Sequence, residues 1–413
     1  MQPTLLYITP TVPALTGNGL SMRAHALLRT LALHYRVFLY IANQPPPARE
    51  TIAALRTLCA EVAFHPIGLW TTSDARSRRV MATIPSLYHR LFPEPSEWTR
   101  ATRSRITNPF TVREFDLAHV FRIYMIPILT GLQRHVRWTH TQLDLDDLES
   151  LTRERLAALY RRRHDRLNAA RMGIEARQYH DIEQRHLTAF DRVLVCTQAD
   201  RSRLLSSGLR PPPDVIPNIV TIPQDVPQID EHIEFRFLFV GNLGYFPNAD
   251  AIRYFVVEIL PLIRSQVSRP IVLDIAGTGL PQSETRQLSR APGVRFLGFI
   301  PEVTEGYRPA DAVIVPLRAG GGTRIKVLEA FAHRRPVVST PEGVEGIEVV
   351  HEKHALIAGT RERFAEACVR LLNEPALGRN LTRHALELVH MRYSEAALVP
   401  LLYKPLHVNA SSL

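Results

Sequence analysis

The sequence of 413 residues has little cysteine, few tryptophans and no long hydrophobic run. Its three cysteines, Cys59, Cys196 and Cys368, are odd in number and stand apart in apolar surroundings, which predicts buried thiols rather than a disulfide framework. No stretch has the uncharged length that a membrane-spanning helix needs, and no basic residue precedes the first apolar run, 5–8. These absences predict a cytoplasmic protein without a secretory signal or a spanning segment.

Lysine is also scarce, because only Lys326, Lys353 and Lys404 are lysines among 50 basic residues. The formal net charge of +10 suits an anionic partner such as nucleic acid, a membrane surface or a phosphorylated substrate. A general bias of the proteome toward arginine would give the same net charge, so the charge alone does not show that the protein has an anionic partner. An apolar content of 45% with 22% charged residues indicates a globular protein, and the length predicts two domains.

The most informative stretch is 319–329, Ala-Gly-Gly-Gly-Thr-Arg-Ile-Lys-Val-Leu-Glu. It follows an apolar run at 312–317 that is typical of a buried strand, and its second half has the apolar spacing of a helix. Three glycines there leave backbone amides uncovered at the helix N-terminus, where an anion binds well. A tight connection without a ligand would use the same glycines. Lys326, beside Arg324, favours a site that needs a compact positive charge.

Strand and helix patterns alternate along both halves of the chain, which predicts two α/β domains with doubly wound parallel sheets. The expected strands are 5–8, 37–41, 115–120 (with His119 at its carboxyl end), 191–197, 215–218, 235–240, 271–276, 294–300, 312–317 and 336–340; the expected helices are 22–33, 151–187, 198–205, 248–267, 325–332 and 394–403. A segment rich in proline and acidic residues, 219–234, is the expected linker.

Three stretches allow two interpretations each. The basic amphipathic stretch 75–92 could lie on an anionic membrane, but a surface helix packed on the N-terminal sheet is favoured. Asp144, Asp146 and Asp147 could bind a metal ion, but a strand end followed by a helix start is favoured. The arginine-rich region 151–187 could bind nucleic acid, but its interleaved acids and lack of stacking aromatics favour a solvated helix pair.

Five segments, in this order and spacing, resemble the C-terminal domain of glycosyltransferase family four: 240–242, 276–279, 296–299, 320–329 and 336–338. The Gly-Gly-Gly-Thr-Arg sequence resembles one subgroup. The resemblance implies a GT-B fold, with Rossmann-like domains at 1–220 and 221–389 that face a cleft and a terminal helix, 390–413, that returns to the first domain. It also implies transfer of a sugar with retention from a nucleotide diphosphate sugar, UDP- or GDP-linked, without a metal ion. The implied acceptor is a glycan, a lipid-linked intermediate or a polysaccharide, bound by the N-terminal domain.

The resemblance also implies roles for individual residues. Glu329 matches the glutamate that holds the ribose hydroxyls, and the amides from Thr323 to Ile325 match the helix start that holds the diphosphate. His119 resembles a histidine near the transferred sugar. The other implied donor-binding residues are Gly298, Phe299 and Ile300 at the base, Gly17 and Gly19 in a loop closing over the donor, and Gly241, Asn242, Gly277, Gly321 and Gly322.

Three positions depart from the common family pattern. Gly321 stands where an upstream glutamate would contact the donor sugar, and Asn242 and Pro247 stand where an arginine and a lysine would neutralise the diphosphate. We expect Arg324 and Lys326 to neutralise it instead, because they flank the amides where the phosphates would lie. A same-face attack, in which the leaving phosphate takes the acceptor's proton, would need few acid–base side chains.

Other functions stay open. A catalytically silent nucleotide-sugar-binding protein or partner subunit is encouraged by Gly321, whereas a nucleotide-sugar epimerase would need acidic groups that the sequence does not supply there. Nucleic-acid binding is the least favoured, since it would depend on charge alone. The basic N-terminal half could also contact the inner face of an anionic membrane from the cytoplasm.

Overall fold

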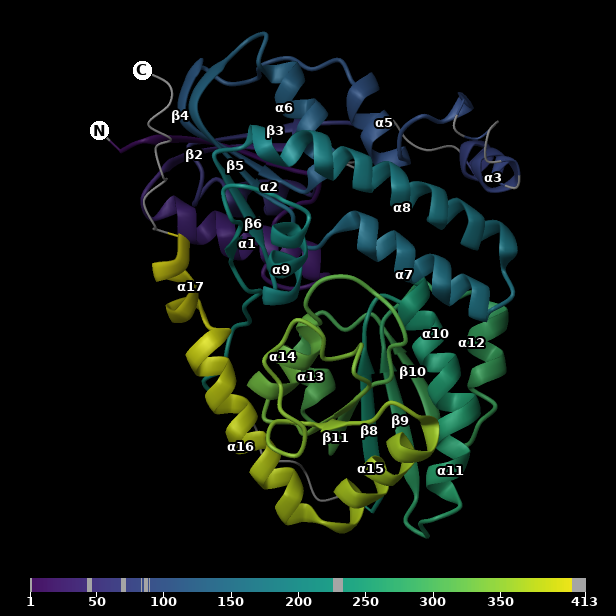
Figure 1. The fold of residues 1–413 in the computed structure, drawn as a ribbon. Helices are drawn as coiled ribbons and strands as arrows, with labels where there is room; N and C mark the ends of the chain where they lie inside the picture. Colours follow the sequence, from purple (N-terminus) through teal and green to yellow (C-terminus); the bar gives the residue numbers. More distant parts are fainter. Residues whose placement is uncertain are drawn as a thin grey trace. The chain divides into compact units, whose positions relative to one another are not determined.

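The computed structural model describes residues 2–42, 47–67, 72–82, 84, 88, 90–225 and 233–402 (Figure 1). The chain forms two compact units, of which the first comprises 1–217 with 399–413 and the second comprises 218–398. The division expected from the sequence was 1–220 with 390–413, and 221–389. Arg192 contacts the segment that returns to the first unit, because its guanidinium donates to the carbonyls of Leu401 and Leu402 at 3.0 and 2.9 Å.

The first unit has a parallel sheet of seven strands in the order β3-β2-β1-β4-β5-β6-β7. The strands are β1 (Thr4–Thr9), β2 (Arg36–Ala42), β3 (Glu61–His65), β4 (Glu114–Phe121), β5 (Arg137–Asp144), β6 (Arg192–Val195) and β7 (Asp214–Val215). The interior strand β1 is buried from its second residue onward, which is why it is a largely continuous apolar run rather than an alternating one.

Helices connect these strands. They are α1 (Gly19–Ala32), α2 (Arg49–Leu55), α3 (Thr72–Met81), α5 (Ser96–Arg103), α6 (Ile126–Leu132), α7 (Glu149–Arg162), α8 (Arg166–His186) and α9 (Gln198–Ser206). The expected helix pair at 151–187 is confirmed as α7 and α8, which lie side by side (Figure 1). Helix α3 packs against α8, so the expectation that 75–92 packs on the sheet is wrong; positions 83, 85–87 and 89 lie outside the described residues.

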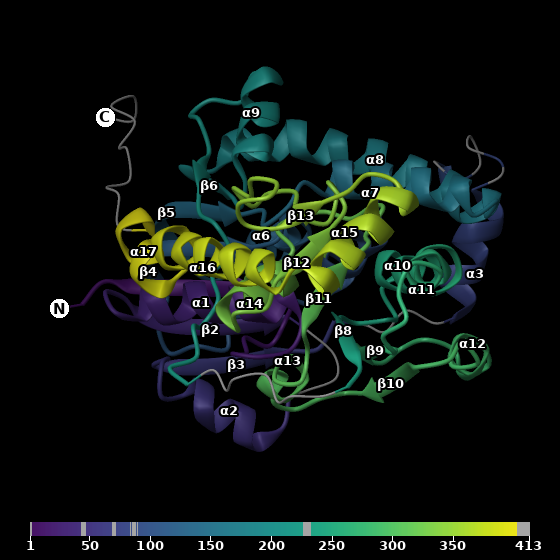
Figure 2. The same ribbon diagram turned by 90° about the horizontal axis from the view of Figure 1, so that it is seen from below.

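The second unit has a parallel sheet of six strands in the order β10-β9-β8-β11-β12-β13. The strands are β8 (Phe235–Val240), β9 (Ile271–Ala276), β10 (Val294–Gly298), β11 (Ala312–Val315), β12 (Val337–Ser339) and β13 (Leu356–Ile357); the helices are α10 (Phe246–Tyr254), α11 (Leu260–Arg264), α12 (Gln282–Leu288), α13 (Val303–Tyr307), α14 (Ile325–Ala332), α15 (Arg361–Asn373) and α16 (Pro375–Arg392), followed by α17 (Glu395–Leu402). Helices α10, α11 and α12 lie on one face of this sheet and α13 and α14 on the other, as right-handed crossovers require (Figures 1 and 2). The expectation of two doubly wound α/β domains is confirmed.

One long helix expected at 248–267 is interrupted. After α10 the chain forms a π-helical segment, Phe255–Ile259, and α11 ends at Arg264. Pro261 lies in the first turn of α11, and because proline has no backbone N–H it cannot continue the regular hydrogen bonds from the preceding turn. The predicted strands at 294–300 and 312–317 also end earlier, at Gly298 and Val315.

The three cysteines are buried and form no disulfide, as expected. None of the helices in the described ranges is long and apolar enough to cross a membrane.

Candidate functional site

The glycine loop leads from β11 to α14 at the carboxyl end of the second sheet. Gly320 has φ 144° and Gly322 has φ 62°, a region of backbone conformation that side chains with a Cβ rarely adopt. Gly321, between them, is not among the glycines with positive φ. The turn therefore needs glycine at positions 320 and 322. The backbone conformation at position 321 does not explain why this chain has glycine there rather than the glutamate of the common family pattern.

Arg324 fixes the shape of this loop. It occupies the N-cap position of α14, is 7% exposed, and donates from Nη1 to the carbonyls of Gly321 and Gly322. A Cβ on Gly320 would lie 3.0 Å from Nη2, so the arginine side chain packs directly on the loop. The guanidinium thus places its charge beside the first turn of α14, where the helix dipole already favours an anion.

The side chain of Lys326 reaches from α14 to the end of β8. Its Nζ donates to Asn248 Oδ1 at 2.8 Å and lies 4.3 Å from the ring centroid of Phe239. A Cβ on Gly241 would come within 2.7 Å of this Nζ, so a side chain at 241 would displace the ammonium group from its present position. The two residues beside the ammonium group, Gly241 and Asn248, are the chain neighbours of Asn242 and Pro247, the positions where the resemblance expects an arginine and a lysine.

The charges of Lys326 and Glu329 are unusually sensitive to pH. Burial lowers the pKa of Lys326 to about 7, and the charge of Arg324 acts in the same direction while Glu329 opposes it. Burial likewise raises the pKa of Glu329 to about 7, opposed by the hydroxyl of Tyr307, which donates to its Oε2 at 3.3 Å, and by Lys326. An anion that enters here would favour the charged form of Lys326 and compensate for its burial.

The loops that follow β8, β9 and β10 are joined by backbone hydrogen bonds. Gly241 N–H donates to the carbonyl of Ala276 at 2.9 Å, and Gly277 N–H donates to the carbonyl of Gly298 at 2.7 Å. Gly277 has φ 145°, and a Cβ there would lie 1.9 Å from the carbonyl oxygen of Gly241. The fold thus brings together the glycines at 241, 277 and 298 from separate parts of the sequence.

Three further predicted donor-binding residues lie at this end of the sheet. Asn242 uses its Oδ1 to accept from Gly244 N–H at 2.9 Å, so it shapes a turn and supplies no charge. Phe299 follows β10 and is 70% exposed, which is unusual for a large aromatic side chain and leaves its ring open to a planar ligand. Ile300 beside it is partly buried and approaches Gly306.

Most of this unit matches a known protein family. Residues 234–374 match the family model described as "Glycosyl transferases group 1". The second unit contains a group 1 glycosyltransferase domain. The loops and helix start described above all lie inside this group 1 domain, which covers about one third of the chain by its bounds.

Solved structures extend the likeness of fold to the whole chain. Sucrose-phosphate synthase (tll1590) from Thermosynechococcus elongatus is 15% identical, with a TM-score of 0.65 and 97% of each chain covered. Anabaena Alr3699/HepE, solved with UDP and glucose, is 12% identical, with a TM-score of 0.61 and 97% and 98% covered. A variant of S. aureus TarM, solved with fondaparinux, alpha-GlcNAc-glycerol and UDP, is 10% identical, with a TM-score of 0.61 and 97% and 99% covered. The fold is that of the GT-B glycosyltransferases. No curated protein sequence matches the chain.

Outside the group 1 domain, the predicted residues of the first unit are placed as follows. Gly17 has φ 118° in the loop before α1, and Asn18 caps that helix by accepting from Ser21 N–H at 2.9 Å. Gly19 was expected in the loop but is the first residue of α1.

His119 does not end its strand, because β4 continues through Val120 and Phe121, which pair with β5. The imidazole is fully buried, with its Nδ1 2.8 Å from Gln142 Nε2 and its ring 4.6 Å from that of Tyr7. Burial lowers the pKa of His119 to about 4, so it is neutral near pH 7. Its Nε2 has no hydrogen-bond partner within the described ranges.

A network of buried ion pairs in the first unit was missed by the sequence analysis. Arg122, with φ 77°, follows β4 and pairs with Asp146 at 3.1 Å and with Asp147 and Glu149. The aspartates do mark a strand end and a helix start, as favoured, and no cluster of metal-ligating side chains occurs among the described residues. A sequence signal for this network does exist. Arg122 follows one strand, β4, and the acidic residues follow the neighbouring strand, β5.

Proposed function

We propose that the protein is a glycosyltransferase that moves a sugar, with retention, from a nucleotide diphosphate sugar to a glycan, lipid-linked or polysaccharide acceptor. The observation that carries this proposal is the position of Lys326 Nζ, between Gly241 and Asn248 at the carboxyl end of β8. The group 1 domain thereby keeps a cation beside the helix start although the expected arginine and lysine positions hold Asn242 and Pro247.

In this proposal each residue has a separate role. The amides from Thr323 to Ile325 bind the diphosphate at the N-terminus of α14, and Lys326 with Arg324 neutralises the charge that develops on the leaving group. Glu329 accepts hydrogen bonds from the ribose hydroxyls, which requires its carboxylate form. The exposed ring of Phe299 contacts the base. The Thr323 hydroxyl, which is buried and finds no hydrogen-bond partner in the described part of the chain, is a further donor to the phosphate.

The reaction itself needs positioning and charge stabilisation more than acid–base chemistry. In a same-face attack the glycosidic bond to the diphosphate breaks, the acceptor hydroxyl attacks the same face, and its proton passes to the departing phosphate oxygen. Lys326 and Arg324 then stabilise the dianionic diphosphate without a metal ion. His119 is neutral and can donate or accept a hydrogen bond but does not supply a positive charge.

The first experiment is a thermal-shift panel with UDP, GDP, ADP and their sugar conjugates, because a ligand that binds the folded state raises its apparent stability. We expect UDP or GDP to raise Tm in the wild type and to do so much less in Lys326→Met. The anomeric configuration of the product, followed by NMR during hydrolysis or transfer, tests retention. A panel in which no nucleoside diphosphate changes Tm contradicts the proposal.

A second candidate is a catalytically silent nucleotide-sugar-binding protein, which Gly321 favours because the carboxylate expected to contact the sugar is absent. The two candidates differ in turnover of the donor. Slow hydrolysis of a bound donor sugar by the wild type supports the transferase. Donor binding without any hydrolysis, together with hydrolysis that appears in Gly321→Glu, supports the silent protein.

A further inference from the structure

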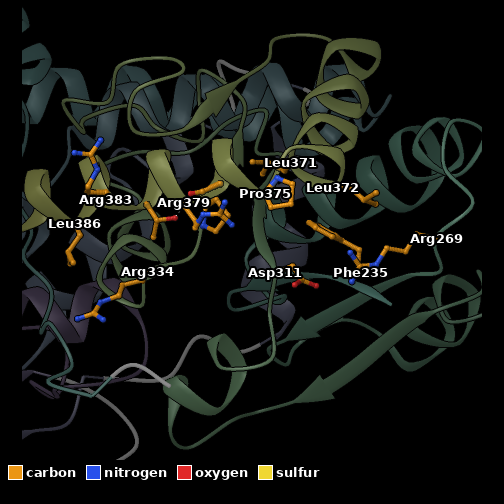
Figure 3. Close-up of a pocket in the computed structure, with 13 residues that line it drawn as sticks. Phe235, Arg269, Asp311, Arg334, Leu371, Leu372, Pro375, Arg379, Arg383 and Leu386 are labelled. Atoms are coloured by element: carbon orange, nitrogen blue, oxygen red, sulfur yellow. Dashed lines mark hydrogen bonds between the residues drawn. The ribbon is translucent and has the colours of Figure 1, made fainter. Parts of the chain in front are cut away.

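A pocket of about 550 Å³ lies in the second unit where the strands of its sheet begin (Figure 3). Its wall contains Phe235 at the start of β8, Pro336 just before β12, and residues of α15 and α16. The loops of the proposed donor site follow the carboxyl ends of the same strands, so this pocket is separate from that site. Its volume is in the range of sites for small molecules.

Arginine dominates the charge of the pocket. Arg334, Arg379 and Arg383 line it, all three are exposed, and none forms an ion pair within the part of the chain that the structure describes. Arg269 also lines it but donates to the carbonyls of residues 233 and 234 at 2.9 and 3.1 Å. The one acidic residue of the lining, Asp311, accepts from the backbone N–H of residue 236 at 2.7 Å. The pocket therefore attracts an anion.

Apart from Thr382, the rest of the lining is apolar and mostly aliphatic. Leu371 is 4% exposed and Phe235 is 6% exposed, while Leu372 and Leu386 are partly exposed. Figure 3 shows Arg334 and Arg383 toward one end and Phe235 and Leu372 toward the other. The Phe235 ring is covered by the guanidinium of Arg269 at 5.6 Å, so little aromatic face remains for stacking a base. An alkyl chain suits this surface better than a nucleotide does.

We propose that this pocket binds an anionic phospholipid at a membrane surface. The phosphate would contact Arg379, Arg383 and Arg334, and the first methylene groups of the chain would pack on the leucines. Arginine near an anionic membrane binds by electrostatic attraction, and the apolar floor adds the hydrophobic contribution that a free phosphate lacks. The net charge of +10 acts in the same direction. This surface differs from the basic N-terminal stretches that the sequence suggested for membrane contact.

The test compares two double variants that lose the same charge. Arg379→Gln with Arg383→Gln removes pocket arginines, whereas Arg290→Gln with Arg363→Gln removes exposed arginines of the same unit outside the pocket. Sedimentation with phosphatidylcholine vesicles, with and without phosphatidylglycerol, measures membrane binding. We expect binding only with phosphatidylglycerol, about thirtyfold weaker in the pocket variant, since each arginine contributes about fivefold. The control should stay near the wild type.

A soluble lipid tests the apolar floor. Calorimetry with dihexanoyl phosphatidic acid should give tighter binding than glycerol 3-phosphate, and Leu372→Asn should reduce that difference. Three outcomes would each overturn the proposal. The first is an equal loss of vesicle binding in both double variants, and the second is equal affinity for the two soluble ligands. The third is binding of the soluble lipid by a protein that does not sediment with anionic vesicles. Nucleoside diphosphate binding, measured on the same samples, should be unchanged in all these variants, so the outcome does not depend on the proposed transferase function.

Discussion

The substitution Lys326→Met tests the central feature of the proposed donor site. Methionine keeps the length and most of the apolar stem of lysine but removes the ammonium group that lies 2.8 Å from Asn248 Oδ1. If this ammonium neutralises a diphosphate, the variant should fold normally and bind nucleoside diphosphates weakly. Its effect should appear in the affinity for UDP or GDP and in the turnover number, because the charge on the leaving group increases in the transition state.

The size of the effect follows from the contact that is lost. A hydrogen bond to a charged group contributes about 1.5–3 kcal/mol, so the variant should bind the diphosphate about tenfold to a hundredfold more weakly. The pH dependence is a second signature. Lys326 has a pKa of about 7 in the free protein, so above pH 7 binding must take up a proton, and affinity should fall by up to about tenfold per pH unit. Lys326→Met should lose this alkaline decrease.

Stability gives a third signature with a definite sign. Because burial lowers the pKa of Lys326 below that of an unfolded lysine, the unfolded chain binds more protons between pH 7 and about 10. The free energy of unfolding attributable to this residue should therefore increase as the pH rises through that window, and Lys326→Met should remove the increase.

Titration calorimetry with UDP and GDP at several pH values measures affinity and proton uptake together. Lys353→Met is the matched control, because Lys353 is an exposed lysine of the same unit. We expect the control to bind as the wild type does at every pH. Equal affinity and equal proton uptake in Lys326→Met and the wild type would refute the assignment of Lys326 to the diphosphate.

Three further substitutions test other parts of the structure. Arg324→Ala should weaken donor binding about tenfold by releasing the glycine loop that its guanidinium holds, as seen in KM for the donor. Gly277→Ala should lower the free energy of unfolding by about 3 kcal/mol, measured by urea denaturation, because its Cβ would collide with the carbonyl of Gly241. Asp144→Ala should cost about 3 kcal/mol in the same assay, because Arg23 would lose two buried hydrogen bonds of 2.8 Å.

Each of these has a control in the same chain. Arg290→Ala removes an exposed arginine, and Gly359→Ala adds a Cβ that meets nothing within 4 Å. Glu362→Ala breaks an exposed ion pair, so we expect a much smaller loss in the free energy of unfolding than in Asp144→Ala. If a control variant changed donor binding or the free energy of unfolding as much as its test variant does, the local cause proposed for that test variant would be wrong.

Several elements could be predicted because local pattern and burial agree. The strands at 235–240 and 271–276 were predicted with the bounds that the structure has, since both are largely apolar runs with buried residues on both faces. Helix α14 was predicted at 325–332 for a similar reason, because its apolar spacing matches its buried side. The short strand β13 and the helices α15 and α16 were not predicted, since neither glycine loops nor long apolar runs mark them.

Strand ends depend on the neighbouring strand, which the local sequence does not contain. His119 was expected at the end of its strand, but Val120 and Phe121 pair with Leu143 and Asp144 and extend β4 by two residues. That extension places the histidine in the interior rather than at the carboxyl end of the sheet.

By itself the sequence determined the alternating α/β architecture, the glycine loop at 320–322 and the burial of cysteines that form no disulfide, because each follows from residues close together in the chain. Only the tertiary structure decided where the cations lie. Lys326 meets Gly241 and Asn248 across more than seventy residues of sequence because parallel strands bring β8 and β11 together and α14 follows from β11. The arginine pocket has the same origin, since residues from β8, α15 and α16 become neighbours only when the sheet forms.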